Sequence, residues 1–371
     1  MTRPSENAEY TIVAPAVRDL DVLAAQLAEW LQMRMPGVNK VHISNLSYPL
    51  GAGKSHETIL FDASWNEDGQ LCEQGLVVRI KPTQHTVYQD DMFNEQYLLM
   101  QTLHELGTVR VAETLWFEED STLLGAPFFV MRKLEGRVAV SDPSYMKQGW
   151  LVEGATPSER LCMWKDAIGQ LAAIQKVPLS TVAFLDRPQA GVSGFDQEWD
   201  RWMRYLGWIG ENRPLPFLHA ACGRLQQTAP ANRPAGIVWG DARLGNMMIG
   251  ADYRVAAVMD WEQTSLGGAL HDLGWWLFHE RLQLLGVGGV LPEGLGTREQ
   301  TIALWSELTG LSTESIDWYE AFAAFKMGCL SVRMLDLKDI TPANNDYDDS
   351  PMNRMIANLL DLPAPTAGRY E

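Results

Sequence analysis

Cysteine is scarce in this chain, and its few cysteines are widely separated. Of the 371 residues only four are cysteine, and none of them forms a CxxC pair. Such pairs are typical of structural zinc sites, while closely spaced cysteines in even numbers are typical of small disulfide-stabilised domains. The sequence therefore predicts neither a zinc site nor a disulfide framework, as is usual in a reducing cytoplasm. The four residues are Cys72, Cys162, Cys222 and Cys329.

Basic residues are fewer than acidic ones, and long apolar runs are missing. Thirty Lys and Arg against 47 Asp and Glu give a formal charge of −17. A field of this sign repels a phosphate backbone, so nucleic acid is not an expected partner. No run approaches the roughly 20 apolar residues that a membrane-spanning helix needs, and the opening segment MTRPSENAEYTIV lacks the apolar core of a signal peptide. We expect a cytoplasmic protein without a membrane partner, and the sequence predicts no particular oligomeric state.

Length and hydrophobic patterning predict two lobes. The chain exceeds the usual single-domain length. Its first third is rich in strand-forming runs, and its remainder is mostly of helical periodicity. The sequence therefore predicts an α+β fold with a small β-rich N-terminal lobe, 1–133, and a larger helical C-terminal lobe, 134–371. In the first lobe we expect helices at 19–33 and 88–106 and strands at 41–50, 57–65, 75–82, 109–117 and 127–134. In the second we expect helices at 158–177, 196–207, 297–309 and 314–336 and a loose loop at 339–351. We also expect a β-rich segment at 236–262, in which two short strands flank a loop.

One short loop holds the residue types that phosphoryl transfer needs. The segment WGDARLGN contains Asp241 and Asn246, and Asp260 ends the strand-like run VAAVMD that follows. Phosphoryl transfer needs an acceptor hydroxyl held in line, a carboxylate that accepts its proton, and a metal that offsets the phosphate charge. Mg²⁺ prefers a few carboxylate or amide oxygens together with phosphates and waters. Each of these residues alone is more often a turn residue, but their combined spacing predicts one base and two metal ligands.

This segment resembles the catalytic loop of the aminoglycoside phosphotransferase and choline kinase-like superfamily, whose pattern HGDxxxxN is followed by a metal-binding aspartate. The resemblance implies a protein-kinase-like bilobal fold that uses ATP and Mg²⁺. It implies that Asp241 is the catalytic base, that Asn246 and Asp260 hold Mg²⁺, and that Arg243 orients the base or meets a phosphate. In the same pattern, Asp272 of HDLGWW corresponds to the buried acid that braces the loop.

The resemblance covers most of the chain in layout, and its specific motifs lie between residues 239 and 276. Trp239 stands where the family usually has a histidine, a position that serves as scaffold more than as reactant. The most similar branch is the one found fused to, or beside, acyl-CoA dehydrogenases.

A glycine-rich turn in the first lobe is a candidate phosphate contact. Gly51, Gly53 and Ser55 lie between two strand-like runs, where glycine lets backbone N–H groups approach phosphate oxygens. The letters GAGKS suggest a Walker A loop, but Tyr48 stands where that motif needs glycine. The run after it, HETILFDASW, alternates as a strand does, whereas a Walker loop opens a helix. We therefore interpret the segment as a glycine turn and not as a Walker loop.

The strand GLVVRIKP supplies two candidate phosphate-binding cations. Arg79 and Lys81 are two residues apart and so share one face of the strand. The resemblance favours Arg79, because related branches of the family carry arginine there. Lys81 stays a candidate, because kinases usually place a lysine at the corresponding strand. Glu95, in the predicted helix, is a candidate partner for that cation. Met131, at the start of the segment that resembles the inter-lobe hinge, is a candidate adenine contact.

The acceptor site is less well defined by the sequence. Four acids of the helical lobe are candidates for an acidic pocket, and five tryptophans are candidates for stacking on a substrate, although acids on helices are usually solvated and such aromatics are more often core. The acids are Glu262, Glu280, Asp336 and Asp339; the tryptophans are Trp199, Trp202, Trp208, Trp275 and Trp276.

Together these patterns predict an ATP-dependent phosphotransferase that transfers the γ-phosphate to a hydroxyl of a small molecule. Aminoglycoside-like compounds, amino-alcohols and hydroxyacyl compounds are the expected acceptors. The alternative is a catalytically silent kinase-like protein that binds nucleotide or ligand, although such proteins typically lose the base or a metal ligand. A protein kinase is disfavoured because the sequence has no DFG, no APE and no recognisable activation segment.

Overall fold

The computed structural model describes residues 18–49, 57–83, 86–141 and 143–365. These residues form two compact units, each of which is described here by itself. The first comprises residues up to 86 together with 114–133, and the second comprises residues 87–113 together with 134 onward. One boundary between these units lies after Lys133. The helix at 93–106, which we expected in the N-terminal lobe, groups with the second unit, and the assignment of functions to the two domains stays a prediction.

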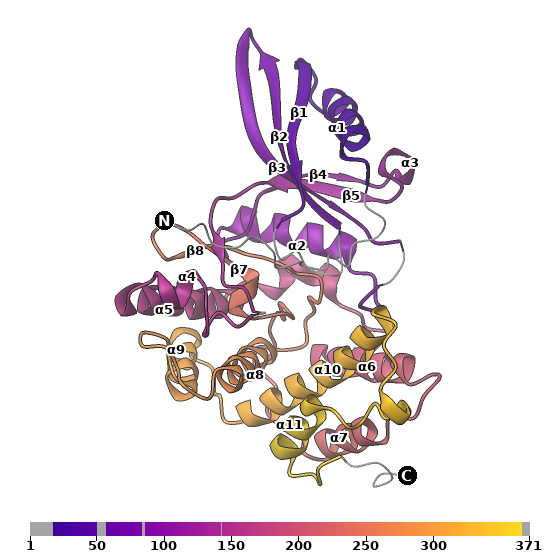
Figure 1. The fold of residues 1–371 in the computed structure, drawn as a ribbon, viewed down its shortest axis with the longest axis vertical. Coiled ribbons are helices and arrows are strands. Elements are labelled where there is room, and N and C mark those ends of the chain that lie inside the picture. The colour runs from indigo at the N-terminus through magenta and orange to yellow at the C-terminus, as the bar shows by residue number, and fades with distance from the viewer. Residues whose placement is uncertain (1–17, 50–56, 84–85, 142, 366–371) are drawn as a thin grey trace, which may run out of the picture. The chain divides into compact units, whose positions relative to one another are not determined.

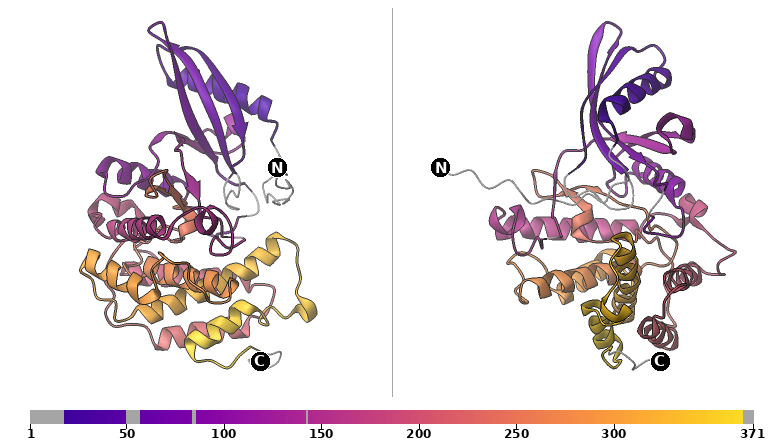
Figure 2. Two further views of the ribbon diagram at one scale, coloured as in Figure 1. Left: turned by 60° about the vertical axis from the view of Figure 1, so that its left-hand side comes forward. Right: turned by 45° about the vertical axis from the view of Figure 1, so that its right-hand side comes forward.

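The first unit is an antiparallel sheet with a helix on one face (Figures 1 and 2). The strand order is β1-β2-β3-β5-β4, and the long hairpin of β2 and β3 pairs without interruption from Glu57↔Ile80 to Glu67↔Gln70. Asp68 and Gly69 form the turn with positive φ values of 49° and 79°, as the two-residue turn of a hairpin favours. The elements are α1 (Leu20–Arg34), β1 (Asn39–Ser47), β2 (Glu57–Glu67), β3 (Gln70–Ile80), β4 (Thr114–Glu118), α3 (Ser121–Leu124) and β5 (Phe128–Arg132).

Alternation along the strands separates a core face from a second face. Leu27 and Trp30 of α1 belong to one buried cluster with Phe61, Val78 and Phe128 of the sheet. Because successive side chains of a strand point to opposite faces, the residues between these point away from α1. The second face therefore carries a different set of side chains.

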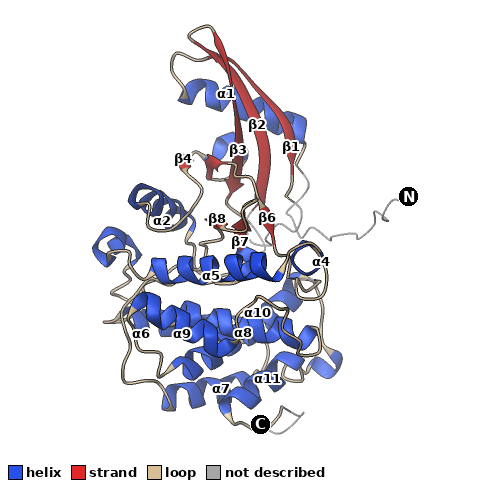
Figure 3. Ribbon diagram, turned by 90° about the vertical axis from the view of Figure 1, so that its left-hand side faces the viewer, coloured by secondary structure: helices blue, strands red, loops and turns tan. Residues whose placement is uncertain are grey.

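The second unit is mainly helical (Figure 3). Helix α10 contacts α8, α7, α6 and α11, so it forms the centre of this unit, while α5 contacts α9. A small sheet of order β6-β7-β8 carries the loop that precedes β7. The helices are α2 (Phe93–Leu106), α4 (Trp150–Glu153), α5 (Pro157–Ile174), α6 (Gly194–Ile209), α7 (Pro216–Gln227), α8 (His271–Gly286), α9 (Arg298–Thr309), α10 (Ile316–Leu337) and α11 (Pro351–Leu360). The 3-10 helices and strands are η1 (Leu179–Leu185), η2 (Leu244–Asn246), η3 (Ala343–Asn345), β6 (Arg137–Val138), β7 (Met247–Ile249) and β8 (Val255–Val258).

Local signals explain where several helices begin. Thr156 caps α5 through a capping box with Glu159, and Pro157 occupies the first turn. Ser193 caps α6 with Asp196 in the same way. These contacts satisfy backbone N–H groups that a helix leaves without partners, so the chain enters each helix at a defined residue.

The predicted α+β class is confirmed, but three local expectations were wrong. Residues 109–113 are not a strand: Val109 and Val111 are buried, yet the backbone of Arg110 bonds to the Gln170 side chain (2.9 Å) and to Val258 N–H (2.8 Å) instead of a sheet neighbour. Residues 236–239 form only isolated bridges, so β7 and β8 both follow the loop that they were expected to flank. The segment 339–351 contains η3 and is fastened by Asp348, which accepts the Phe217 N–H at 2.8 Å.

Within the described residues, no single helix has the length and hydropathy to cross a membrane. One pair, α5 with η1, meets the criterion together by length and composition, with a bend of 79° between its parts.

The crossing of α8 and α10 depends on Gly274. A Cβ atom at this position would lie 2.6 Å from the Tyr319 carbonyl carbon and 2.7 Å from its oxygen. We expect Gly274→Ala to lower the free energy of unfolding by about 1–3 kcal/mol, because backbone atoms cannot give way as a flexible side chain does. Urea unfolding followed by circular dichroism measures this change.

Gly223→Ala in α7 is the matched control, since no atom lies within 4 Å of the Cβ that it adds. It should stabilise the protein by roughly 0.5–1 kcal/mol, because alanine favours the helix. Equal unfolding midpoints for the two variants would contradict the close packing of α8 against α10.

Candidate active site

The loop at 239–246 is held in place by a buried carboxylate. Asp272, in the first turn of α8, accepts the backbone N–H of Trp239 at 2.6 Å and that of Gly240 at 2.9 Å. Burial raises the pKa of Asp272 to about 6, while the two N–H donors favour its charged form. Asp272 thus has the bracing position that the family resemblance implies.

Gly240 is required by the path of this loop. Its φ is 101°, in the region that favours glycine, and an added Cβ would lie 2.3 Å from the Cβ of Gln263. The close approach brings the loop against the segment that follows Asp260.

Asp241 is surrounded by three hydrogen-bond donors. Its carboxylate accepts Asn246 Nδ2 at 2.5 Å, Trp275 Nε1 at 2.9 Å, and Arg243 Nε at 3.1 and 3.2 Å. Burial alone would raise the pKa of Asp241, but the charge of Arg243 and the donated hydrogen bonds hold it below its ordinary value. The side chain is therefore a carboxylate at neutral pH, as a proton acceptor must be.

Backbone contacts bring Asp260 next to Asn246. Met259, the residue before Asp260, donates its N–H to Asn246 O at 2.9 Å and accepts Trp239 Nε1 on its carbonyl at 2.8 Å. Asp260 itself has φ 63°, a left-handed conformation that Asp tolerates better than most residues. The indole of Trp239, where the family usually has histidine, thus links the loop directly to the residue before Asp260.

Arg243 also lies near Tyr145, which is hydrogen-bonded to Glu280. Arg243 Nη1 donates to Ser141 Oγ at 3.0 Å. Nearby, Tyr145 donates its hydroxyl to Glu280 Oε1 at 2.5 Å. Glu280 is partly exposed as a residue, but burial of its carboxyl group raises its pKa to about 7. This candidate acceptor-site acid is therefore near its midpoint at physiological pH.

Tyr88 and Gln263 also belong to this site, and sequence reasoning missed both. Gln263 Nε2 donates to Tyr88 Oη at 2.6 Å. Burial first, and then the charges of Glu262, Asp241 and Asp260, raise the pKa of Tyr88 well above 10, so the phenol stays protonated. The sequence offers one signal for Gln263, its position only three residues after Asp260. It offers no signal for Tyr88, because a single tyrosine belongs to no motif.

Two of the predicted nucleotide contacts share one face of the first unit's sheet. Arg79 pairs with Phe129 and Val77 pairs with Met131, so Arg79 and Met131 lie on the face opposite α1. Lys81 follows two residues after Arg79, and its N–H donates to Pro127 O at 2.9 Å. Met131 lies inside β5, before the connection to β6. Their roles as nucleotide contacts stay predictions.

The remaining nucleotide candidates are placed differently. Gly51, Gly53 and Ser55 lie outside the described residues. Glu95, in the first turn of α2, forms an ion pair with Arg187 inside the second unit. The predicted pairing of Glu95 with a cation of β3 joins the two units and stays a prediction.

The candidate acceptor residues fall into two groups. Glu262 is buried and Glu280 accepts the Tyr145 hydroxyl, whereas Asp336 forms an ion pair with Arg213 at 2.5 Å and Asp339 is exposed. Of the tryptophans, three are buried core residues and two are half-buried. The buried ones are Trp202, Trp275 and Trp276; the half-buried ones are Trp199 and Trp208.

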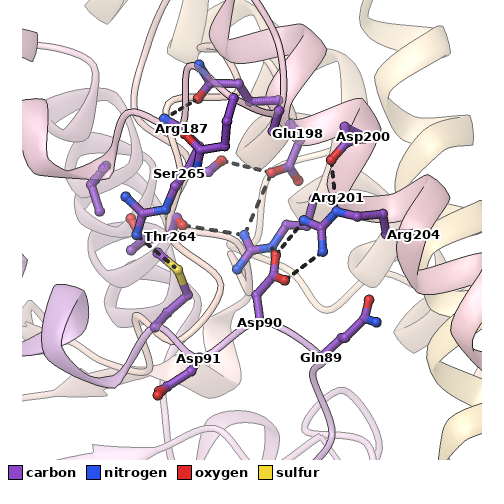
Figure 4. Close-up of a pocket in the computed structure, with 15 residues that line it drawn as sticks. Gln89, Asp90, Asp91, Arg187, Glu198, Asp200, Arg201, Arg204, Thr264 and Ser265 are labelled. Atoms are coloured by element: carbon purple, nitrogen blue, oxygen red, sulfur yellow. Dashed lines mark hydrogen bonds and ion pairs between the residues drawn. The ribbon is translucent and has the colours of Figure 1, made fainter.

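A separate polar pocket of about 600 Å³ lies within the second unit (Figure 4). Arg187, Arg201 and Arg204 line it together with acids, and each arginine contacts a carboxylate. Asp90 bonds Arg204 through both oxygens, at 2.8 and 2.9 Å. The pocket therefore presents paired charges, not an excess of one sign.

Comparison with known proteins places this arrangement in a family. The model of the family described as "Phosphotransferase enzyme family" matches residues 57–295, which is more than half of the chain. This range contains the loop, Asp260 and Asp272.

Solved structures share the fold over nearly the whole chain. One from Ralstonia eutropha, described as an aminoglycoside phosphotransferase, has a TM-score of 0.68 and 23% identity and covers 91% of this chain and 98% of its own. A thermostable mutant of an aminoglycoside phosphotransferase, in ternary complex with ADP and hygromycin B, has a TM-score of 0.53 and 15% identity, covering 92% and 100%. At these identities the likeness establishes the fold, and the predicted protein-kinase-like class is confirmed.

Curated relatives confirm the predicted branch. Acyl-CoA dehydrogenase family member 11 of Rattus norvegicus is 22% identical over 312 residues, which is 81% of this chain and 38% of the relative. The chain thus spans less than two fifths of the length of this relative.

The buried carboxyl of Glu280 generates a pH-dependent prediction. Its pKa is about 7 in the folded protein and near 4.5 when unfolded. Between these values the folded state keeps a proton that the unfolded state has lost, so stability falls as pH rises through this range. Glu280→Gln should make the decline shallower and leave the part that Asp272, with its pKa raised to about 6, contributes. A series of melting temperatures from pH 4.5 to 8 measures this change. A control variant, Glu314→Gln at an exposed position, should follow the wild type; a Glu280→Gln profile parallel to the wild type would refute the assignment.

Proposed function

The chain belongs to the phosphotransferase enzyme family, and we propose that it transfers the γ-phosphate of ATP to a hydroxyl group of a small molecule. The observation that carries the proposal is the convergence of Asp241, Asn246 and Asp260. Their backbone is fixed by Asp272, by Trp239 and by the Asn246–Met259 hydrogen bond. Such a rigid set is what positioning and electrostatic catalysis need.

Asp241 accepts the proton of the acceptor hydroxyl in this proposal. Its lowered pKa keeps it ionised, and its hydrogen bonds fix the direction of the carboxylate. Arg243 lies at the same carboxylate and carries a permanent positive charge. It is therefore suited to orient the base and to meet the phosphate that moves.

Asn246 and Asp260 are the proposed Mg²⁺ ligands. Asn246 uses its Nδ2 for Asp241 O and Oδ2, at 3.1 and 2.5 Å, so its Oδ1 is the atom left for a cation. One amide oxygen and one carboxylate suit Mg²⁺, which takes its other ligands from phosphates and water. Elsewhere in the described residues, no cluster of three or more His, Cys, Asp or Glu suits a metal ion. When bound, Mg²⁺ neutralises charge on the nucleotide phosphates.

The nucleotide would lie on the sheet face that carries Arg79 and Met131. A cation from Arg79 or Lys81 meets the α- and β-phosphates, and the segment from Met131 onward reads the adenine edge. The glycine turn with Gly51, Gly53 and Ser55 completes the phosphate contacts. Support comes from the shared strand face and from the structural neighbour that is in complex with ADP.

The acceptor is a small molecule that carries a hydroxyl group. Hygromycin B is bound in a structural neighbour, and the curated relatives are named as acyl-CoA dehydrogenases. We therefore propose aminoglycosides, amino-alcohols and hydroxyacyl compounds as the acceptor classes for a screen of acceptor-dependent ADP release. A chain that binds Mg-ATP and releases no ADP with any of these classes would favour the catalytically silent alternative.

Asp241→Asn isolates the role of the base. We expect it to lower kcat by about 10²–10⁴-fold, because the amide cannot accept the proton. Thermal stabilisation by Mg-ATP should be nearly unchanged, since the metal ligands remain. Single-turnover transfer and a thermal-shift titration measure the two effects, and wild-type turnover in this variant would refute the assignment.

Asp260→Ala tests the metal site. We expect weaker stabilisation by Mg-ATP as well as slower transfer, because the only proposed carboxylate ligand is removed. The thermal-shift titration is repeated at several Mg²⁺ concentrations, with Asp252→Ala, at the exposed turn before β8, as control. The same titration curve for Asp260→Ala and the wild type would exclude this residue as a ligand.

A further inference from the structure

A lysine is enclosed in the centre of the helical unit. Lys326 of α10 is 1% exposed, and its Nζ lies 3.5 Å from Glu198 Oε1 on α6. Burial would raise the pKa of Glu198, but the charges of Lys326 and Arg201 hold it at about 2. Burial lowers the pKa of Lys326, and the charges of Glu198 and Asp272 oppose that lowering. We treat the pair as ionised because the ammonium group lies directly beside the carboxylate. Glu198 is itself fixed by Ser265 Oγ at 2.8 Å and Trp202 Nε1 at 2.9 Å (Figure 4 shows Glu198 beside Ser265 and Arg201). Lys326 therefore has a defined position although its side chain is flexible by nature.

The ammonium group of Lys326 faces the ring of Trp275. Nζ lies 4.9 Å from the centroid of that indole, within the range of a cation–π contact. His279 stacks against the same indole with centroids 4.9 Å apart, but burial lowers its pKa to about 4, so it is neutral at pH 7. The positive charge at the ring thus comes from Lys326.

The N–H edge of the same indole contacts the proposed base, Asp241. Trp275 is 1% exposed, and its Nε1 donates to Asp241 Oδ1 at 2.9 Å. A cation above an aromatic face draws electron density from the ring, so the N–H at its edge becomes a stronger donor. Lys326, Trp275 and Asp241 form one continuous electrostatic chain from α10 to the loop.

Trp275 and Asp272 lie three residues apart on α8 and so share one side of the helix. Asp272 holds the backbone of the loop at Trp239 and Gly240, while Trp275 holds the side chain of Asp241. The other two donors to Asp241 have further proposed tasks, since Arg243 meets phosphate and Asn246 meets the metal. Trp275 is the one of these three donors that has no further proposed task.

We propose that Trp275 is a positioning residue for Asp241 and that Lys326 strengthens the hydrogen bond by which it acts. The positioning role rests on the proposed function of Asp241 as base, whereas the hydrogen bond and the effect of Lys326 do not. Trp275 is in this respect the side-chain counterpart of the backbone brace provided by Asp272.

The hydrogen bond is tested by NMR on protein labelled with ¹⁵N-tryptophan. The indole N–H resonance of Trp275 is identified by its loss in Trp275→Phe. We expect it downfield in the wild type and shifted upfield in Asp241→Asn, because a neutral amide is a weaker acceptor than a carboxylate. An upfield shift is also expected in the double variant Lys326→Met, Glu198→Gln, which removes both charges of the pair. Arg201, the other cation beside Glu198, keeps Asp90 as its partner in this variant. Lys326→Arg, which keeps the cation, should retain the wild-type shift.

The functional readout is a split between kcat and KM. Trp275→Phe keeps an aromatic ring but removes the N–H, so we expect kcat to fall about 10- to 100-fold with the KM for Mg-ATP within about twofold, since the metal ligands are untouched. Trp318→Phe is the matched control, because it removes another buried indole, whose Nε1 donates to Leu225 O at 3.0 Å. It should cost stability without changing kcat more than about twofold.

The NMR test and the kinetic test can each be distinguished from failure of the proposed function. An indole resonance that does not respond to Asp241→Asn overturns the hydrogen bond, and one that does not respond to removal of the Lys326 charge overturns the role of Lys326. A wild-type kcat in folded Trp275→Phe overturns the positioning role. If the wild type transfers phosphate to no acceptor, the positioning role falls with the proposed function, and the NMR results still decide the hydrogen bond and the effect of Lys326.

Discussion

The candidate site depends on one buried carboxylate, that of Asp272, which binds two consecutive backbone N–H groups of a loop that has little regular structure of its own. A buried charge is costly unless hydrogen bonds satisfy it, and Trp239 and Gly240 supply those bonds at 2.6 and 2.9 Å. The carboxylate requires donors and the two buried N–H groups require an acceptor, so these hydrogen bonds hold the loop against α8. Asp272 thereby positions the loop from which Asp241 bonds Asn246 and Trp239 bonds Met259.

Around this anchor the site is built from elements distant in the sequence. The base comes from the loop, one of its donors from α8, the proposed metal ligands from the loop and the end of β8, and a phenol from the residues before α2. Asp241, Asn246 and Tyr88 are each held by a hydrogen bond from outside their own element. Such a site is rigid because its parts constrain one another, which favours positioning as the main source of catalysis.

The sequence directed attention to this loop, because Asp241, Asn246 and Asp260 lie close in the chain and their residue types suit phosphoryl transfer; their roles stay predictions. It also predicted the long hairpin and most helices, whose periodicity is strong. It missed α11, because the Pro- and Asp-rich composition just before it pointed to a loop. The apolar residues at 109–111 resembled a strand, but their backbone partners, Gln170 and Val258, come from elsewhere in the fold. Tyr88, and the contact of Trp275 with Asp241, could not be predicted for the same reason: an aromatic residue becomes a site residue only through neighbours that folding brings to it.

The division of the chain into compact units has a consequence for dissecting the protein. The first unit is discontinuous, since residues 87–113 leave it and return. No single cut excises it: a fragment ending at Lys133 would include α2 but leave behind Arg187, Arg204 and Gln263, which bind Glu95, Asp90 and Tyr88 at its start. An isolated sheet unit would need a short linker that joins residue 86 directly to residue 114, with α2 supplied on the complementary fragment.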